Sequence, residues 1–395
     1  MIPDPWKDWI EGHLNKRRDR DLLRTLEPLE PKSPVHVERE SGGELTLFSS
    51  NDYLGLSGDQ RVIDGVIETV ENFGLGPRGS PLICGYSTLH ERLEKKIATW
   101  KGTEAALLCP TGFSANLAVI SALSDEDTTI FSDALNHASI IDGCTLARRK
   151  GAKLQVYPHC DTEALQTMLQ NCSTSRAIVV TDSVFSMDGD LAPLRRLAGL
   201  CEQYDALFVI DEAHGSFAFG EEGRGLAEFR GVTDRVDVHV ATLSKGAGGL
   251  GGFVATTSSL RRLLLNQGRS YIYSTAAPLS IIGGLLAAID IVTSDPTLQQ
   301  RLWRRIQQLG DGLQRELKSP IVPIIIGDKS AALQASDFLR QRGIDVTAIR
   351  PPTVPEGTSR LRITVSAAHT EDDIDRLIDA LRQLPISAKQ AGKKA

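Results

Sequence analysis

The chain alternates short apolar runs with stretches in which apolar residues recur every three or four positions. The short runs are rich in Val, Ile, Leu and Ala, as buried strands are; they cover 104–110, 128–133, 152–158, 176–183, 206–212 and 236–244. Helical patterns lie between the first five, at 112–123, 137–150, 162–170 and 193–204. This alternation predicts an α/β fold with a mostly parallel sheet covered by helices on both faces. Ligands of such sheets bind at the carboxyl ends of the strands, so candidate chemistry is sought there.

The pattern changes near residue 294, where Ser294-Asp295-Pro296 interrupts a long helical stretch. Beyond it we predict helices to about residue 317, at 329–342 and at 371–384, with strands at 321–326, 344–349 and 359–367. We therefore expect an N-terminal helix and hairpin segment (1–50), a large domain (51–293), a small C-terminal α+β domain (294–385) and a polar tail (386–395).

Composition narrows the class of protein. The 395 residues are 41% hydrophobic and 24% charged, which excludes a disordered chain. A formal charge of -6 disfavours nucleic acid as a partner. The most apolar segment, 281–289, is too short to span a bilayer, and no export signal is visible. The six cysteines form no CxxC and the eight histidines show no metal-ligand spacing, so we expect reduced thiols, a cytoplasmic location and no metal.

Lys245 follows the predicted strand 236–244 and precedes a run of glycines. A lysine at the end of a buried strand loses hydration, which lowers its pKa and makes its amine nucleophilic. The alternative is a lysine that extends from the strand end to solvent. The glycines themselves fit the dinucleotide fingerprint GxGxxG at 246–251, but that fingerprint requires a following helix. Phe253-Val254-Ala255-Thr256-Thr257 predicts a strand instead, so we reject dinucleotide binding.

Asp211 ends the apolar run 206–211, and His214 follows three residues later. A carboxylate at that place can pair with a protonated ring nitrogen, cap a helix or bind Mg²⁺. Residues 110–116 supply small side chains at a predicted helix start, where free N–H groups and the helix dipole favour an anion. A lysine, an acid and an anion cradle at strand ends are together the set that a pyridoxal-phosphate enzyme requires.

Long motifs make this interpretation more specific, and they lie at 49–57, 77–94, 111–119, 136–143, 183–194, 210–225, 242–252, 272–278 and 348–364. In this order they resemble the α-oxoamine synthase family of fold-type-I pyridoxal-phosphate enzymes, from the N-terminal helix to about residue 385. The resemblance implies the fold of those transferases, with pyridoxal 5'-phosphate as cofactor and acyltransfer with decarboxylation as reaction.

The resemblance also implies roles for individual residues. Lys245 would hold the cofactor and act as base, Asp211 would pair with the pyridine nitrogen and His137 would stack on the ring. The other expected cofactor contacts are Gly112, Phe113, Ser186, His214, Thr242, Ser274 and Thr275. Expected substrate contacts are Arg24, Asn51, His137, Thr353 and Arg362. Arg360 lies on the same face of its strand as Arg362 and is the rival for the substrate carboxylate.

Within the family, the chain most resembles the member of biotin synthesis that joins L-alanine to a pimeloyl thioester, carried by coenzyme A or by acyl carrier protein. Ser274 and Thr275 resemble a loop that reaches the neighbouring subunit's cofactor phosphate, which implies a homodimer with shared active sites; capping of the next helix is the alternative. The segment 74–87 departs from a glycine- and serine-rich family stretch through Pro77, Arg78 and Pro81. Arg148-Arg149 and Arg261-Arg262 could meet coenzyme A phosphates, but solvated helix faces are favoured.

Other functions stay open from the sequence. The chain could be a 2-amino-3-ketobutyrate ligase, 5-aminolevulinate synthase or serine palmitoyltransferase type of enzyme; the prolines at 351–352 favour the alanine-using member. A catalytically silent partner subunit is disfavoured because Lys245, Asp211 and His214 are all present. A regulator that senses pyridoxal phosphate would need a DNA-binding module, for which residues 1–50 leave little room.

Overall fold

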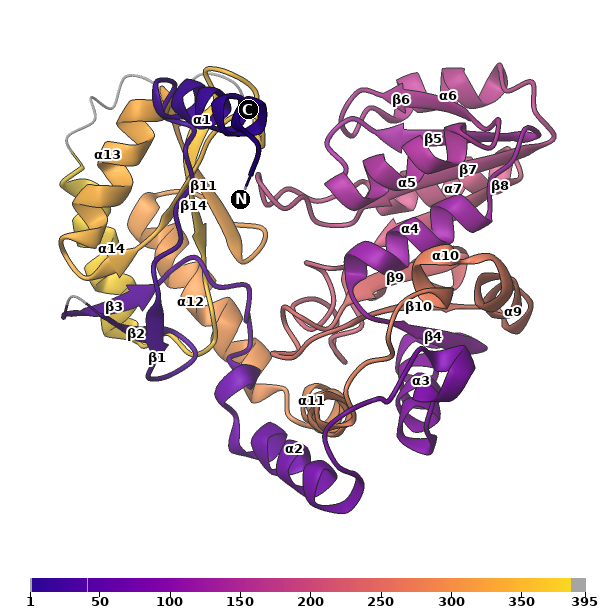
Figure 1. Cartoon of the computed structure of the whole chain (residues 1–395), viewed down its shortest axis with the longest axis horizontal. Coiled ribbons are helices and arrows are strands. Elements are labelled where there is room, and N and C mark those ends of the chain that lie inside the picture. Colours follow the sequence, from indigo (N-terminus) through magenta and orange to yellow (C-terminus); the bar gives the residue numbers. More distant parts are fainter. Residues whose placement is uncertain (1, 41, 385–395) are drawn as a thin grey trace.

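A computed structural model of the chain describes residues 2–40 and 42–384. Its centre is a seven-stranded sheet in the order β4-β10-β9-β8-β7-β5-β6 (Figure 1). Strands β5 to β9 run parallel, whereas β10 is antiparallel to both β4 and β9. The predicted α/β fold with a mostly parallel sheet is therefore confirmed. The strands are β4 (Ala105–Cys109), β5 (Thr128–Asp133), β6 (Lys153–Tyr157), β7 (Arg176–Asp182), β8 (Ala206–Asp211), β9 (Val238–Thr242) and β10 (Gly252–Thr256).

Helices cover both faces of the sheet because successive strand residues point to opposite sides. Ile178 and Val180 of β7 belong to one buried core, while Val179 belongs to the other. The first core is covered by α4 (Gly112–Ala122), α5 (Ala138–Arg148), α9 (Ser258–Gln267) and α10 (Arg269–Ile272). The second is covered by α3 (Thr88–Lys101), α6 (Thr162–Gln170), α7 (Leu194–Gln203) and α11 (Leu279–Ser294), and α2 (Gln60–Phe73) packs on α11. A short α8 (Leu226–Phe229) follows β8.

The glycine run between β9 and β10 is a turn and does not begin a helix. Gly248 and Gly251 have φ angles of +67° and +130°. Residues other than glycine adopt such positive φ angles only with backbone strain. Strand β10 follows directly, in the sheet. The prediction that a strand, and not a helix, follows these glycines is therefore confirmed.

The C-terminal part packs helices on a three-stranded antiparallel sheet in the order β11-β14-β13. The predicted strand 344–349 divides into two, and the first piece pairs in parallel with β3 (Glu44–Leu47) of the N-terminal hairpin. The elements are α12 (Thr297–Leu313), β11 (Ile321–Gly327), α13 (Lys329–Arg340), β12 (Ile344–Asp345), β13 (Thr347–Ile349), β14 (Ser359–Thr364) and α14 (Glu371–Arg382). The domain limits at residues 50 and 293 stay a prediction, and the tail 386–395 lies outside the described residues.

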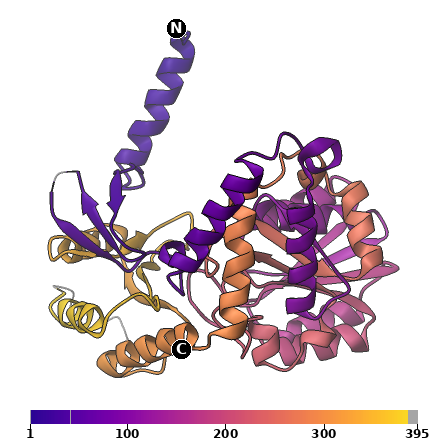
Figure 2. The ribbon, with the colours of Figure 1, turned by 90° about the horizontal axis from the view of Figure 1, so that it is seen from below.

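The N-terminal segment consists of α1 (Asp4–Arg18), β1 (Leu29–Pro31), β2 (His36–Arg39) and β3 (Glu44–Leu47). Helix α1 projects from the body of the molecule, and none of its residues is buried (Figure 2). No single helix of the described residues is long and apolar enough to cross a membrane; α11 and α12 pass that test only as a pair bent by 73°.

Candidate active site

The carboxyl ends of β7, β8 and β9 meet the first turns of α4 and α5 around a cavity of about 200 Å³. This is the place at which parallel sheets bind ligands. Of the predicted cofactor contacts, all except Ser274 and Thr275 line this cavity. The lining residues are Thr111, Gly112, Phe113, His137, Ser139, Asp182, Ser186, Asp211, Ala213, His214, Thr242, Ser244 and Lys245.

Lys245 reaches the cavity from the turn after β9. Its Nζ lies 2.8 Å from Nε2 of His214. Burial lowers the pKa of Lys245 to about 8, although the carboxylates of Asp211 and Asp182 oppose that shift. About a tenth of this amine is therefore unprotonated at pH 7, far more than for an ordinary lysine, and that fraction can act as a nucleophile or base.

Asp211 and Asp182 end neighbouring strands in register, so two carboxyl groups share one wall of the cavity. Asp211 accepts hydrogen bonds from Asn116 Nδ2 at 2.6 Å and from the Ala213 amide at 2.8 Å. Burial and the charge of Asp211 raise the pKa of Asp182 well above its usual value. Protonation of Asp182 is therefore favoured when both carboxyl groups face the cavity.

His137 caps the N-terminus of α5, and its side-chain Nδ1 accepts from the Ser139 amide at 3.2 Å. Burial lowers the pKa of His137, so the neutral ring is favoured, against the opposing charge of Asp211. His214 is similarly held neutral because burial, together with Lys245, Arg362 and His137, lowers its pKa.

The start of α4 forms the anion-binding end of the cavity. Thr111 is the N-cap and accepts from the Ser114 amide at 3.0 Å, while the amides of Gly112 and Phe113 precede the first intrahelical bonds. A Cβ on Gly112 would lie 2.9 Å from Cβ of Thr242, so glycine is needed for this approach. One cavity is thus lined by three groups that fit three parts of one ligand. The free N–H groups fit a phosphate, Asp211 fits a pyridine nitrogen and Lys245 fits an aldehyde carbon.

Arg360 and Arg362 differ in whether a carboxylate of the protein is paired with them. Arg360 forms an ion pair with Asp188, whereas no carboxylate of the described residues is paired with Arg362. Arg362 donates from Nε to the Ser186 carbonyl at 2.5 Å and from Nη2 to Asn51 Oδ1 at 3.2 Å. Its buried charge therefore remains available to a carboxylate brought by a substrate.

Six predicted residues are not among those that line this cavity. Arg362 and Asn51 connect to it through the lining residue Ser186, and the other four are Arg24, Thr353, Ser274 and Thr275. Arg24 and Thr353 contact each other, with 3.4 Å between Nη2 and Oγ1. Ser274 donates to the Ser270 carbonyl at 2.7 Å, and neither it nor Thr275 is among the lining residues. Within one chain, the predicted phosphate contact of this loop is therefore not formed.

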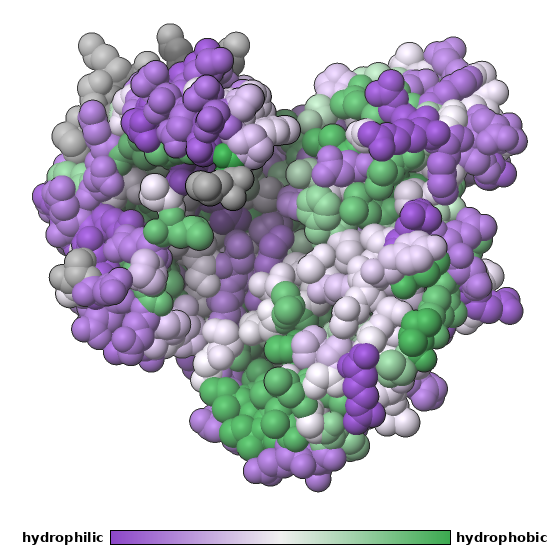
Figure 3. Space-filling model, in the orientation of Figure 1, coloured by the Kyte–Doolittle hydropathy of each residue, from purple (hydrophilic) through white to green (hydrophobic). Residues whose placement is uncertain are grey.

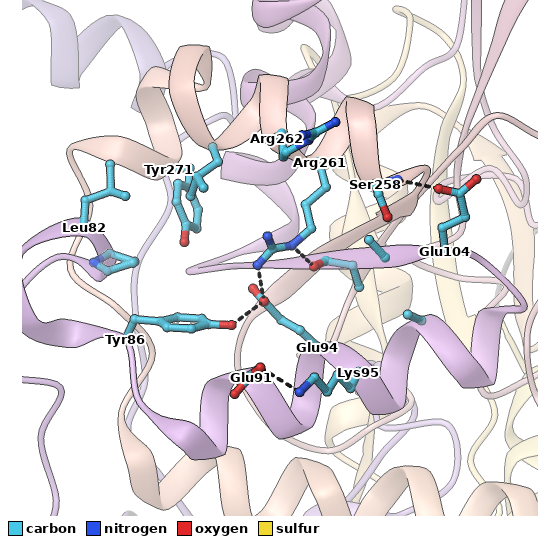
Figure 4. A pocket seen from close by; sticks show the side chains of 15 residues that line it. Leu82, Tyr86, Glu91, Glu94, Lys95, Glu104, Ser258, Arg261, Arg262 and Tyr271 are labelled. Carbon is cyan, nitrogen blue, oxygen red and sulfur yellow. Dashed lines mark hydrogen bonds and ion pairs between the residues drawn. The ribbon is translucent and has the colours of Figure 1, made fainter.

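A larger cavity of about 600 Å³ lies at the opposite, amino-terminal end of β4 (Figure 4). Glu94 is buried in its wall and accepts from Tyr86 Oη at 2.8 Å and Arg261 Nη2 at 2.6 Å. Arg261 also donates to the Ala106 carbonyl at 2.7 Å. Arg261 is thus occupied by protein groups, which disfavours its alternative role toward coenzyme A phosphates.

Comparison with known proteins agrees with this geometry. The model of the family described as "Aminotransferase class I and II" matches residues 44–381. The 8-amino-7-oxononanoate synthase of Anaeromyxobacter dehalogenans is 43% identical over 393 residues, covering 98% of each chain. That of Arabidopsis thaliana is 45% identical over 353 residues, covering 86% of this chain and 74% of its relative. The chain belongs to the 8-amino-7-oxononanoate synthase family.

Solved structures of similar fold place the family among pyridoxal-phosphate enzymes. Serine palmitoyltransferase from S. paucimobilis, with a bound aldimine of pyridoxal phosphate and myriocin, has a TM-score of 0.89 at 28% identity, covering 97% of this chain and 98% of that one. The 8-amino-7-oxononanoate synthase of Francisella tularensis has a TM-score of 0.71 at 27% identity, covering 85% and 96%. The predicted fold-type-I transferase fold, pyridoxal-phosphate dependence and enzyme class are confirmed.

One cluster outside the cavity bears on metal binding. Asp133, His159 and Cys160 bring potential ligand atoms within 4.8 Å of one another. His159 lies between Asp133 Oδ1 at 2.9 Å and Asp190 Oδ2 at 2.6 Å. Burial disfavours its charge, but these hydrogen bonds outweigh burial and raise the pKa of His159 to about 12. Both ring nitrogens then carry protons, which disfavours a metal; the absence of a metal stays a prediction.

Sequence reasoning assigned no role to four side chains that complete the site: Tyr53, Asn116, Ser139 and Asp182. Tyr53 Oη lies 2.5 Å from His214 Nδ1 and donates to Asn51 Oδ1 at 3.3 Å. The contact between Tyr53 and His214 joins residues 161 positions apart, which no local spacing in the sequence reveals. Asp182, in contrast, ends a predicted strand as Asp211 does, so the strand-end rule could have identified it.

Proposed function

We propose that this member of the 8-amino-7-oxononanoate synthase family condenses L-alanine with a pimeloyl thioester and releases CO₂, using pyridoxal 5'-phosphate, as a step of biotin synthesis. The observation that carries the proposal is one cavity lined by Lys245, Asp211 and the N-terminus of α4. Sequence identity favours this substrate pair, because two relatives with that name are 43% and 45% identical to this chain. The Francisella tularensis synthase and serine palmitoyltransferase are more distant, at 27% and 28%. Overall fold alone does not choose between acyl acceptors.

The cofactor's contribution, when it is bound, is an electron sink for negative charge at the amino-acid α-carbon. The amides of Gly112 and Phe113 would bind its phosphate, and Lys245 would hold it covalently. Asp211 would keep a proton on the pyridine nitrogen. His137 would pack on the ring and limit its orientation.

The remaining residues act on the amino acid. Arg362 binds and orients its carboxylate, with Asn51 beside it. Lys245 Nζ, whose pKa burial lowers to about 8, removes the α-proton and later returns one. Orientation of the carboxylate by a buried arginine is a positioning effect that contributes substantially to rate.

A panel assay tests the proposed function. The purified protein is offered alanine, glycine or serine with pimeloyl, acetyl, succinyl and palmitoyl thioesters, carried by coenzyme A or acyl carrier protein, and thiol release is followed. We expect pimeloyl transfer to be fastest and alanine to be preferred over glycine, imperfectly, because one methyl group is worth only about 1–3 kcal/mol. Faster condensation with glycine and a short acyl group would move the chain to another α-oxoamine synthase activity.

The two arginines of β14 give a matched pair of variants. Because Arg362 has no carboxylate partner within residues 2–40 and 42–384 and Arg360 is neutralised by Asp188, we expect Arg362→Ala to raise KM for alanine by about ten- to a hundredfold. Arg360→Ala should change that KM far less and reduce thermal stability instead. Steady-state kinetics over alanine concentration separate the two, and the reverse ranking would transfer the carboxylate role to Arg360.

A homodimer with shared active sites is part of the proposal. Helix α2 exposes Ile63, Ile67, Val70 and Phe73 along one side, and Figure 3 shows this apolar region at the lower end of the molecule. A contiguous apolar surface of this kind is typical of a subunit interface. A cytoplasmic location is likewise proposed, in keeping with six cysteines that are all free.

Mixing two inactive variants tests the shared site. Lys245→Ala chains are combined with chains in which Ser274 and Thr275 are both alanine, and dimers are allowed to re-form. If the loop acts on the neighbouring subunit, one site of each hybrid carries both defects and the other is intact, so activity reappears. No recovery, with loop variants that are inactive by themselves, would place the loop in its own chain's site.

A further inference from the structure

Three buried polar side chains and the half-buried ring of His137 form one hydrogen-bonded series across the wall of the cavity. Asn116 Nδ2 donates to Asp211 Oδ2 at 2.6 Å and to Ser139 Oγ at 2.9 Å. Ser139 Oγ in turn lies 2.7 Å from His137 Nδ1. Asn116 and Ser139 are 1% and 0% exposed, so neither bond competes with solvent. The series joins the predicted partner of the pyridine nitrogen to the predicted ring-stacking histidine.

The donors and acceptors fix the direction of every proton in this series. Asp211 is an acceptor, because the Ala213 amide also donates to it. The Asn116 amide therefore directs its N–H groups to Asp211 and to Ser139. His137 Nδ1 accepts from the Ser139 amide, so the hydroxyl of Ser139 also donates to Nδ1. The only proton left to the neutral ring is on Nε2.

A second observation shows that the orientation of Asn116 is maintained at a cost. Its Oδ1 is buried and has no hydrogen-bond partner among the described residues. Reversing the amide would direct this oxygen at the Asp211 carboxylate, which is repulsive. The close packing of α4 on α5 brings the two residues together: a Cβ on Gly143 would lie 3.0 Å from the Ile120 side chain and 3.4 Å from the Asn116 carbonyl.

We propose that Asn116 and Ser139 are positioning residues that hold Asp211 as a carboxylate and His137 as a neutral ring protonated on Nε2. A carboxylate in a buried wall needs N–H donors to stay charged. Asp182 differs from Asp211 in this respect. It accepts a hydrogen bond from the backbone amide of His137, and its raised pKa favours the protonated form. Lys245, His214, Asp142 and Asp182 are the other ionisable groups around the series.

The inference rests on the proposed function, because its consequence is tighter binding of pyridoxal phosphate through Asp211. The variants are Asn116→Leu, which removes both donors, Asn116→Asp, which keeps the shape, and Ser139→Ala. Ser124→Ala is the matched control, since Ser124 is equally buried and donates to the Ile120 carbonyl of the same helix. Full-length protein freed of cofactor is titrated with pyridoxal phosphate, and its thermal unfolding is recorded alongside.

We expect the dissociation constant to rise about tenfold or more in Asn116→Leu, since a hydrogen bond to a charged group is lost. Asn116→Asp should bind weakly at pH 8 and recover as pH falls, because a protonated carboxyl can donate again; Asn116→Leu should not recover. Ser124→Ala should bind as the unchanged protein does.

The second readout is the side-chain ¹⁵N spectrum of labelled histidine in the cofactor-bound protein, with His137 assigned through His137→Asn. We expect Nε2 to carry the proton, and Ser139→Ala to raise the pKa of His137 because a donor to the neutral ring is lost. Unchanged affinity in both Asn116 variants, or an unchanged His137 titration in Ser139→Ala, would overturn the inference. Failure of the unchanged protein to bind pyridoxal phosphate would instead overturn the proposed function.

Discussion

Replacing Lys245 by alanine is expected to lower the proposed condensation of alanine with the acyl thioester by at least about a thousandfold, because one change removes both the proposed covalent anchor and the proposed base. Lys245→Arg should be equally inactive, since guanidinium keeps the charge but offers no amine at neutral pH. Thiol release measures both variants against the unchanged protein.

A labelling experiment locates the anchor independently of turnover. Borohydride reduction of the unchanged protein, followed by digestion and mass spectrometry, should place the cofactor on Lys245. The informative competitor is Lys101, a fully buried lysine whose pKa is also lowered by burial. Lys101 is already engaged by Glu212 at 2.9 Å and Ser216 at 2.8 Å, so we expect no label there. Label on Lys101 would contradict the assignment of the site.

Asp211→Ala lowers turnover by on the order of a hundred- to a thousandfold while pyridoxal phosphate still bonds to Lys245. We propose that this carboxylate keeps the pyridine nitrogen protonated, and its removal would weaken the electron sink. Absorption spectra of the variant establish that cofactor is present, and thiol release gives the rate.

Asp182→Asn is the matched control for that variant. Asp182 ends the neighbouring strand in register with Asp211, and its raised pKa favours the protonated form, which asparagine imitates in shape and charge. The asparagine oxygen can still accept from the His137 amide. We expect an effect below about tenfold. If Asp182→Asn were as damaging as Asp211→Ala, the single negative charge would belong to Asp182.

The sequence by itself determined the elements that carry the chemistry. Period and composition predicted β7, β8 and β9 and the helices between them, because local side-chain alternation reports burial on both faces of a strand. Asp211 and Lys245 could therefore be placed at strand ends without coordinates. Motif order supplied the family, and with it the expectation for His137.

Only the tertiary structure decided which of these groups touch and in what charge state. Arg360 and Arg362 are equivalent in the sequence pattern, and Asp188, 172 residues from Arg360, neutralises one of them. Asn116 reaches Asp211 across 95 residues, and Tyr53 reaches His214 across 161. Strand β10 was predicted as a strand, but its antiparallel direction depends on pairing with β4 and β9. Local periodicity encodes burial, whereas partner choice depends on side chains that meet only after the chain has folded, and those partners set the pKa values of this site.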